Sequence, residues 1–282
     1  FIFMTELKGL TVEEISNFLQ TLDIKETYRA QQLAKWIYQK KTNDFSLMTD
    51  ISKKTREIIS SSAKISNLKI REHFKDPLDF AQKILIELDD GNFIESVIIP
   101  DDDRNTICVS SQCGCALNCE FCATGKALPF KRNLTAFEII EQIFICDKIL
   151  TTENKKITNI VFMGMGEPFL NFENVINVCK ILTSHYGFAF AAHRITISTA
   201  GLTPEIRKFA DLPIKIELAV SLNAVDDITR SKIMPINKKY NLDDLCQAIE
   251  YYNHQRPKQQ CTCEYVMLAG INDDENSLRK LI

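Results

Sequence analysis

Three cysteines with metal-ligand spacing, Cys115, Cys119 and Cys122, lie on one short segment of the chain. A Cys-x3-Cys-x2-Cys spacing brings three thiolates within reach of one site, and thiolates favour zinc or an iron–sulfur cluster. A structural zinc site normally has four ligands, so Cys113 or a more distant cysteine would have to complete it. If three cysteines alone bind a four-iron cluster, one iron stays open to chelate a substrate or cofactor. The segment therefore predicts a metal centre, which in the three-cysteine form is catalytic.

The remaining composition favours metal or redox chemistry inside the cell. The chain has 282 residues and ten cysteines, and five of the ten lie between Cys108 and Cys122. The first residues lack the pattern of a secretory signal, so a disulfide framework is not expected and the predicted location is cytoplasmic. No apolar run approaches the roughly 20 residues of a membrane span. The formal net charge of -3 excludes a uniformly basic nucleic-acid coat.

Short β-branched segments alternate with helical patterns from about residue 105 onward. A helix is expected after Thr135, because Thr135 and Glu138 have the spacing of a capping box. Alternating strands and helices predict a parallel sheet, open or closed into a barrel, that binds ligands at the carboxyl ends of its strands. The chain reaches Ile282 within a helical pattern, so a closing strand is expected to be missing. The expected strands are Thr106 to Ser110, Asn159 to Met163, Arg194 to Ser198, Ile216 to Ser221 and Cys261 to Leu268.

Two smaller regions precede this alternating part. Amphipathic patterns from Thr11 and over Tyr28 to Lys41 predict helices. A period-two pattern on both sides of Asp89 to Asn92 predicts a β-hairpin, followed by a linker at Pro100 to Asp103. The expected organisation is a helical accessory domain over residues 1–63, a β-hairpin and linker over 64–104, and an α/β core over 105–282 that is truncated at its carboxyl-terminal end.

The accessory domain is locally basic although the whole chain is slightly acidic. Between Lys25 and Arg56, eight Lys or Arg residues stand against three Asp or Glu residues, an excess of five positive charges. One interpretation is a solvated helix face, because charge runs often serve only solubility. The other is a surface that contacts nucleic-acid phosphates, because such affinity depends on where the charge lies.

The cysteine spacing after a predicted strand resembles the signature of radical S-adenosylmethionine (SAM) enzymes, in which the open iron of a [4Fe–4S] cluster binds SAM. The surrounding sequence is more specific and resembles the RlmN/Cfr family of RNA adenine methyltransferases. The resemblance runs from about Leu7 to the last residue and includes the amino-terminal helices. Its blocks, in the order of the family, are Cys108 to Gly125, Arg132 to Thr135, Phe162 to Pro168, Ile195 to Gly201, Met234 to Tyr240 and Glu264 to Leu268.

This resemblance implies a radical SAM methyltransferase that methylates carbon 2 of an adenine in 23S ribosomal RNA and in transfer RNA. It implies a partial (β/α)6 TIM-type barrel with its last strand missing, a [4Fe–4S] cluster and two SAM molecules per turnover. A one-electron reductant of the flavodoxin or ferredoxin type and a monomeric protein are also expected. Two alternatives stay open: methylation at carbon 8 of adenine, and a metal-stabilised RNA-binding module without catalysis.

Carbons 2 and 8 of adenine are not nucleophilic, so they cannot accept a methyl group directly from the SAM sulfonium. The implied mechanism avoids this barrier by radical addition. In the family, a cysteine near the carboxyl terminus is first methylated, and its methyl carbon then adds to the adenine as a radical. A base removes the ring proton, and a second cysteine releases the product by forming a disulfide bond. The family's carboxyl-terminal block, with the methyl-carrying cysteine, has no counterpart before Ile282.

The resemblance also implies a role for individual residues. Glu95 matches the base, and Cys108 matches the cysteine that releases the product. Asn223 is a departure, since the family usually has histidine there and an amide cannot ionise. The segment Lys126 to Phe130 is a second departure, because it lacks the glycine that the family favours before the phenylalanine. The implied cluster ligands are Cys115, Cys119 and Cys122, and the implied SAM-binding residues are Gly166, Glu167, Ser198, Ser221, Leu222 and Asn223.

Overall fold

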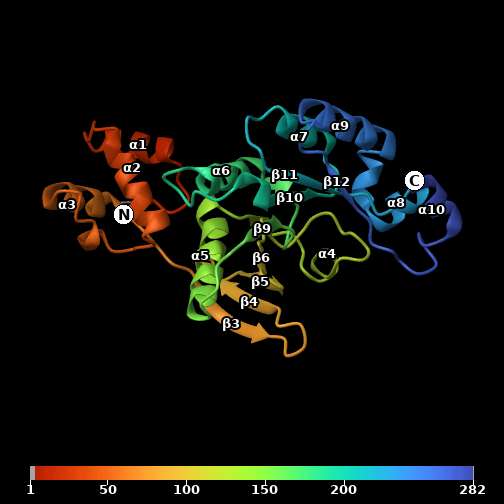
Figure 1. Ribbon diagram of the computed structural model, residues 1–282, viewed down its shortest axis with the longest axis horizontal. Coiled ribbons are helices and arrows are strands. Elements are labelled where there is room, and N and C mark those ends of the chain that lie inside the picture. Colours follow the sequence, from red (N-terminus) through yellow and green to blue (C-terminus); the bar gives the residue numbers. More distant parts are fainter. Residues whose placement is uncertain (1–3, 282) are drawn as a thin grey trace.

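A mixed sheet of eight strands forms the centre of the protein (Figure 1). The structure is a computed structural model that describes residues 4–281. The strand order is β12-β11-β10-β9-β6-β5-β4-β3, in which β6 and the strands from β9 to β12 are parallel and the others antiparallel. The strands are β3 (Lys69–Lys75), β4 (Gln82–Glu87), β5 (Phe93–Asp101), β6 (Arg104–Cys108), β9 (Asn159–Phe162), β10 (Ile195–Thr199), β11 (Glu217–Ser221) and β12 (Thr262–Glu264).

Helices connect the parallel strands, and most of them pack against one face of the sheet, whereas α8 (Asp227–Ile233) lies at the carboxyl ends of the strands. In β9 and β10 every second residue is buried, including Ile160, Phe162, Ile195 and Ile197. Because successive side chains of a strand point to opposite faces, the alternate set lies on the other face. The alternation of strands and helices predicted from the sequence is confirmed, although β12 is shorter than expected. The connecting helices are α5 (Ala136–Thr152), α6 (Phe172–Thr183), α7 (Thr203–Ala210), α8 (Asp227–Ile233) and α9 (Leu242–Gln255), and α10 (Glu275–Leu281) follows β12.

Helix α5 begins with the predicted capping box. The N–H of Glu138 donates to the Thr135 hydroxyl at 3.2 Å, and the Glu138 carboxylate accepts from the N–H of Thr135 at 2.8 Å. Arg132 also donates to this carboxylate at 2.7 Å. The start of the helix is thereby fixed to the segment that follows the cysteine loop.

The predicted hairpin is part of the main sheet. β4 and β5 pair antiparallel, as the period-two pattern predicts. β5 continues through Pro100 and Asp101, which pair with Asn105 and Arg104 of β6, so the expected linker is a tight turn that joins the hairpin to the core. The edge strand β3 has no counterpart in the sequence prediction, because all of its residues are exposed and none shows the alternation of a buried face.

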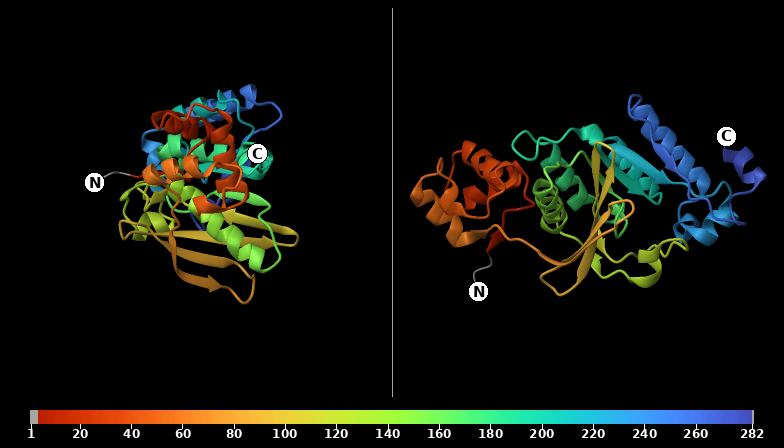
Figure 2. Two further views of the ribbon diagram at one scale, coloured as in Figure 1. Left: turned by 90° about the vertical axis from the view of Figure 1, so that its left-hand side faces the viewer. Right: turned by 60° about the horizontal axis from the view of Figure 1, so that its bottom comes forward.

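The amino-terminal helices lie at one end of the molecule, beside α5 and α6 (Figure 2). Helices are present at both places where the periodicity predicts them, and the first begins with a capping box formed by Thr11 and Glu14. Among the described residues, no helix is both long and apolar enough to cross a membrane. The elements of this region are β1 (Thr5–Glu6), α1 (Val12–Thr21), α2 (Tyr28–Ala34), α3 (Lys53–Ser62) and β2 (Ala63–Lys64).

A buried ion pair attaches this region to the core. Lys8 Nζ donates to Glu141 Oε2 of α5 at 2.6 Å, and both side chains are almost fully buried. Lys8 also donates to the carbonyl of Ser66 at 2.7 Å, and Glu141 accepts from the N–H of Leu68 at 3.2 Å. The next residue, Gly9, has φ +98°, and a Cβ there would lie 2.4 Å from the backbone nitrogen of Phe137. The backbone therefore touches α5 directly, and the ion pair holds it there.

Breaking this ion pair should destabilise the protein. Lys8→Met leaves the Glu141 carboxylate buried without its cation, which should lower the free energy of unfolding by about 3 to 5 kcal/mol. The double variant Lys8→Met/Glu141→Met should recover much of this loss, because no charge is then left buried. Denaturant unfolding of both single variants and the double variant measures the coupling. If the losses of the two single variants simply add up in the double variant, the two side chains are not coupled and this prediction is wrong.

Candidate functional site

The carboxyl ends of the parallel strands meet at one edge of the sheet, and most predicted site residues lie on the loops that leave them. Backbone groups that leave the sheet still need hydrogen-bond partners when they are buried. Gln112, after β6, accepts with Oε1 from the N–H of Glu167, after β9, at 2.8 Å. The Glu167 carboxylate in turn accepts from the N–H of Ala200, after β10, at 2.7 Å. Polar side chains thus connect the ends of β6, β9 and β10.

The same connection continues to the last strand. The guanidinium of Arg230 donates to the carbonyls of Ala200 and Ser221 at 2.8 and 2.9 Å, which joins the ends of β10 and β11. Asn223, after β11, accepts with Oδ1 from the N–H of Val266, after β12, at 2.8 Å. Each pair of neighbouring parallel strands is therefore joined at its carboxyl end by a polar side chain.

The cysteine loop leaves β6 and is held at two points. Gly114 has φ +75° and crosses the following segment so closely that a Cβ would lie 2.1 Å from the carbonyl oxygen of Pro129. Further along, the N–H of Glu120 donates to the carbonyl of Ile233, the last residue of α8, at 2.8 Å. The path of the loop before Cys115 therefore depends on a glycine, because a side chain at that position has no room.

The thiols of Cys115, Cys119 and Cys122 share one neighbourhood. Burial, together with the charges of the other two thiols, raises the pKa of Cys119 to about 12. Burial and, to a smaller extent, the charges of Glu167 and Cys122 raise the pKa of Cys115. Among the described residues, no three Cys, His, Asp or Glu side chains converge as ligands of a single metal ion. In a four-iron cluster each thiolate binds a different iron, so its ligands surround a body and do not meet at one point.

Cys113 has different surroundings from these three. It lies in the short strand β7 (Gln112–Cys113), which pairs with β8 (Arg132–Asn133), and its Sγ donates to the carbonyl of Phe93 at 3.8 Å. Burial raises the pKa of Cys113, and the charges that act on it belong to neighbours such as Arg132 and Asp90 and not to the three clustered thiols. The structure therefore separates Cys113 from Cys115, Cys119 and Cys122.

Gly166 and Glu167 form a buried corner after β9. Gly166 has φ +97°, and a Cβ there would lie 2.4 Å from Gln112 Cβ. Both oxygens of the buried Glu167 carboxyl accept backbone hydrogen bonds, from Phe169 at 3.0 Å and from Ala200 at 2.7 Å. Burial raises the pKa of Glu167 to about 7. In the described part of the chain, the groups that act on this pKa include no Lys or Arg, so the carboxyl has no cationic partner.

Ser198, Ser221 and Leu222 lie at the ends of β10 and β11. Ser198 donates with its hydroxyl to Glu264 Oε2 of β12 at 2.9 Å. The N–H of Leu222 donates to the carbonyl of Glu264 at 2.9 Å, and Ser221 pairs with Glu264 in the sheet. The three residues predicted from the resemblance are thus brought together around Glu264.

Asn223 is buried and has φ +58°, a backbone conformation that asparagine adopts more readily than most residues. Its Nδ2 donates to Met234 Sδ at 3.3 Å, and its carbonyl accepts from Asn272 Nδ2 at 2.7 Å. With Oδ1 accepting from the N–H of Val266, both polar atoms of the Asn223 side chain have a hydrogen-bond partner inside the protein. It therefore shapes the loop after β11.

Glu95 and Cys108 lie on the same face of the sheet. Val97 pairs with Cys108, and Glu95 is two residues from Val97 on the same strand, so both side chains point away from the helices. Glu95 is half-exposed and lies 3.2 Å from Lys83 Nζ. Burial raises the pKa of Cys108 to about 11, so this thiol is protonated at neutral pH.

Sequence reasoning missed Arg230, Glu264 and Asn272, which hold the loops of this edge. Charged residues are rarely fully buried, so a helix pattern places an arginine such as Arg230 on the solvent side. The available signal was positional: Glu264 lies within the matched block Glu264 to Leu268, and Arg230 precedes the matched block Met234 to Tyr240 by one helical turn.

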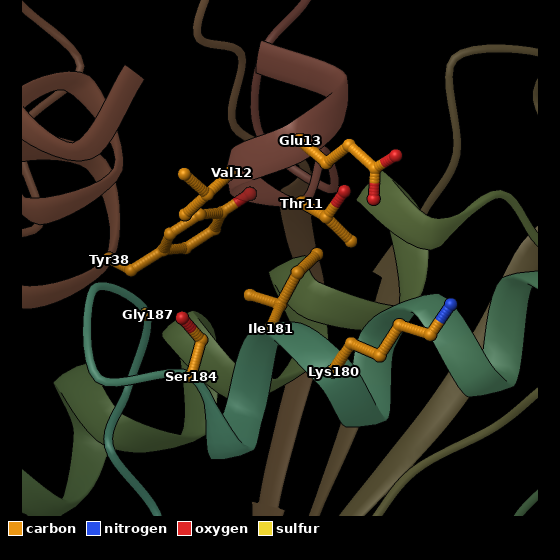
Figure 3. Close-up of a pocket in the computed structure, with 8 residues that line it drawn as sticks. All are labelled: Thr11, Val12, Glu13, Tyr38, Lys180, Ile181, Ser184 and Gly187. Carbon is orange, nitrogen blue, oxygen red and sulfur yellow. The ribbon is translucent and has the colours of Figure 1, made fainter. Parts of the chain in front are cut away.

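A separate cavity of about 210 Å³ lies between the amino-terminal helices and α6 (Figure 3). Its lining includes Glu13 and Tyr38 on one side and Lys180 and Ser184 on the other. None of its lining residues belongs to the strand ends described above.

Comparisons with known proteins agree along nearly the whole chain. Residues 5–65 match the ribosomal RNA large subunit methyltransferase N-terminal domain, and residues 109–282 match the radical SAM superfamily. A protein of Geobacter sulfurreducens named dual-specificity RNA methyltransferase RlmN is 43% identical over 99% of this chain and 75% of its own length. A protein of the same name from Wigglesworthia glossinidia brevipalpis is 45% identical over 97% of this chain and 72% of its own length.

A solved structure has the same fold. The crystal structure of a radical SAM methyltransferase from Sphaerobacter thermophilus superposes with a TM-score of 0.89 and 36% sequence identity, over 98% of this chain and 80% of that chain. The cysteine loop, the parallel strands and the amino-terminal helices thus all have counterparts in known proteins. The chain belongs to the RlmN family of radical SAM methyltransferases.

Proposed function

We propose that the protein is a radical SAM RNA methyltransferase that methylates carbon 2 of an adenine in ribosomal RNA and in transfer RNA. The observation that carries the proposal is the match to dual-specificity relatives over 97% to 99% of the chain. The grouping of Cys115, Cys119 and Cys122 after the first parallel strand supports it. The parallel strands and their helices would form the core of a partial (β/α)6 barrel. The relatives described above carry the RlmN name, which favours carbon 2 over carbon 8, and they are named methyltransferases, which favours catalysis over a binding module.

The three clustered thiols are the proposed ligands of a [4Fe–4S] cluster. Two features fit this group: the thiols act on one another's pKa, and Cys113 lies in other surroundings. The raised pKa values of Cys115 and Cys119 mean that a cationic metal centre is needed to keep these two as thiolates at neutral pH. When bound, the cluster and SAM supply an electron and a carbon-centred radical.

The buried corner at Gly166 and Glu167 is the proposed place of the SAM amino group. A buried carboxyl without a cationic partner suits an ammonium ligand, because the ligand would supply the missing charge. Ser198, Ser221 and the loop of Leu222 and Asn223 would border the rest of the molecule. The hydrogen bonds of Asn223 within the protein indicate that it acts by shaping this loop.

The open face of the sheet is the proposed place of the adenine. Glu95 and Cys108 share this face, and Glu95 is half-exposed beside Lys83. A carboxylate at this position would accept the ring proton. The Cys108 thiolate would attack the sulfur of the family's methyl-carrying cysteine, so that a disulfide bond forms while the sulfur–carbon bond to the adduct breaks, and the released carbon would take up a proton to become the methyl group. An adenine within a helix cannot reach such a face, so an unstacked base is the expected substrate.

The basic accessory region is the proposed contact for RNA phosphates, but its charges are not equivalent. Lys41 pairs with Asp147 of α5, and Lys40 Nζ lies 3.3 Å from the ring centroid of Trp36. Lys53 and Lys54 are exposed in the first turn of α3, where the helix dipole adds to their positive potential. These two lysines are the better candidates for phosphate contacts.

Cluster ligation is tested by single substitutions. Cys115→Ala, Cys119→Ala and Cys122→Ala should each abolish iron uptake during anaerobic reconstitution, because each removes one thiolate of the proposed set. Cys113→Ala is the matched control and should retain iron. Iron per chain and visible absorption are the measurements. Loss of iron from a folded Cys113→Ala variant would refute the three-ligand assignment.

Glu167 should make stability depend on pH. Because its pKa is raised to about 7, the folded chain binds this proton more tightly than the unfolded chain, where the pKa is about 4.3. Its contribution to stability is therefore complete below about pH 4 and is lost as pH rises through about 7. Between about pH 5 and pH 8 the free energy of unfolding of the wild type should fall more steeply than that of Glu167→Gln. Exposed Glu173→Gln is the control, and parallel profiles for the wild type and Glu167→Gln would exclude the titration.

Charge reversal tests the RNA surface. Lys53→Glu/Lys54→Glu should weaken RNA binding and lower the slope of affinity against salt by roughly one for each phosphate that the protein no longer neutralises. Lys215→Glu/Lys258→Glu changes the net charge equally at exposed sites elsewhere and should leave the slope unchanged. Filter binding of a structured RNA across a salt series measures both. Equal effects of the two double variants would mean that only net charge matters.

A further inference from the structure

Arg230 of α8 is an arginine with no exposed surface. Its Nε donates to the carbonyl of Leu222 at 2.9 Å, and its Nη1 donates to Asn237 Oδ1 at 2.9 Å. Its Nη2 donates to the carbonyls of Ala200 and Ser221 at 2.8 and 2.9 Å. The guanidinium thus ties together the carboxyl ends of β10 and β11 and the segment after α8.

All four acceptors of Arg230 are neutral oxygens. Of the described residues, Asp227 is the carboxylate whose charge acts on Arg230, and it does so through space without a hydrogen bond. A buried cation is costly unless an anion offsets it. Burial lowers the pKa of Arg230 to about 10, so the side chain stays charged at neutral pH. The positive charge therefore lacks a partner at the place where it is held.

Helix α8 brings this charge close to the cysteine loop. Cys119 is among the groups whose charge acts on Arg230. Ile233, one helical turn after Arg230, accepts from the N–H of Glu120, and Cys119 packs against the apolar cluster that includes Ile233 and Met234. Helix α8 therefore contacts the cysteine loop directly, and its Arg230 guanidinium lies between this loop and the ends of β10 and β11.

We propose that Arg230 is a positioning residue with two tasks. The planar fork of its guanidinium N–H groups fixes the ends of β10 and β11 by hydrogen bonds, and its charge offsets the negative charge of the thiolate-bound cluster. The inference rests on the proposed function. Three thiolates bring three negative charges, and one-electron reduction adds another. A fixed cation beside them favours the reduced state, since the net charge and surroundings of a cluster set its reduction potential.

The chain offers a matched control in Arg256, which follows α9. It is also buried and also donates to backbone carbonyls, those of Ala210 at 3.2 Å and Phe209 at 2.7 Å among them. Its carbonyl partners lie in and after α7, before β11 begins, so it serves the opposite edge of the sheet. Arg256→Met removes an equivalent buried fork without touching the cysteine loop.

The experiment uses the full chain, reconstituted anaerobically with iron and sulfide, and four variants. Arg230→Met and Arg230→Gln remove the charge, Arg230→Lys keeps the charge without the fork, and Arg256→Met is the control. Three properties are measured: the melting temperature of the cluster-free chain, the iron bound per chain, and the midpoint potential of the cluster from a reductive titration followed by electron paramagnetic resonance.

All four variants should melt below the wild type, because each leaves buried carbonyls without donors. Only Arg230→Met and Arg230→Gln should shift the midpoint potential to more negative values. Arg230→Lys and Arg256→Met should stay close to the wild type. Failure of a folded Arg230→Met or Arg230→Gln chain to retain iron that Arg256→Met retains would also support the inference, since the uncompensated cluster would then be lost.

Two results would overturn the inference while leaving the proposed function intact. The first is an unchanged potential in both Arg230→Met and Arg230→Gln with full iron content. The second is an equal shift in Arg230→Lys, which would assign the effect to geometry and not to charge. Absence of iron from the wild-type chain would overturn the proposed function and this inference together.

Discussion

The need to pair every backbone group at the buried carboxyl edge of the parallel strands governs this structure. Five strand ends meet there, and the loops leave the sheet before their N–H and C=O groups can bond to a neighbouring strand. Side chains from Gln112, Glu167, Arg230 and Asn223 supply the partners and join each strand end to the next. The edge is therefore stiff, and the positions of its loops follow from hydrogen bonding.

Two of these side chains, the Glu167 carboxyl and the Arg230 guanidinium, are an acid and a base that make no hydrogen bond to each other. The Glu167 carboxyl binds the N–H of Ala200, and the Arg230 guanidinium binds its carbonyl. One residue at the end of β10 thus keeps an anion and a cation apart within the same buried edge. Among the described residues, neither group has a hydrogen-bonded partner of opposite charge, which suits a site that receives a ligand with an ammonium group on one side and a thiolate-bound cluster on the other.

The pairing of buried polar groups also fixes the position of the accessory region. Lys8 and Glu141 pair in the interior, and Gly9 lets the backbone lie directly on α5. The amino-terminal helices are consequently fixed on the helical side of the sheet, whereas Glu95 and Cys108 lie on the open side. An RNA that contacts Lys53 and Lys54 must therefore extend around the end of the sheet to place a base on that face.

The cysteine spacing, the alternation of strands and helices, the capping boxes and the family could all be predicted from the amino-acid sequence, because they depend on neighbours along the chain or on ordered blocks. Three features required the folded chain: Pro100 and Asp101 continue strand β5 up to a tight turn within one sheet, Cys113 lies apart from the other three cysteines, and the Asn223 side chain makes hydrogen bonds within the protein. The burial of Arg230, which helix periodicity assigns to solvent, is a fourth. The physical reason is the same in each case: pairing and desolvation at the strand ends involve residues far apart in sequence, and no local pattern records which carbonyls a distant side chain will find.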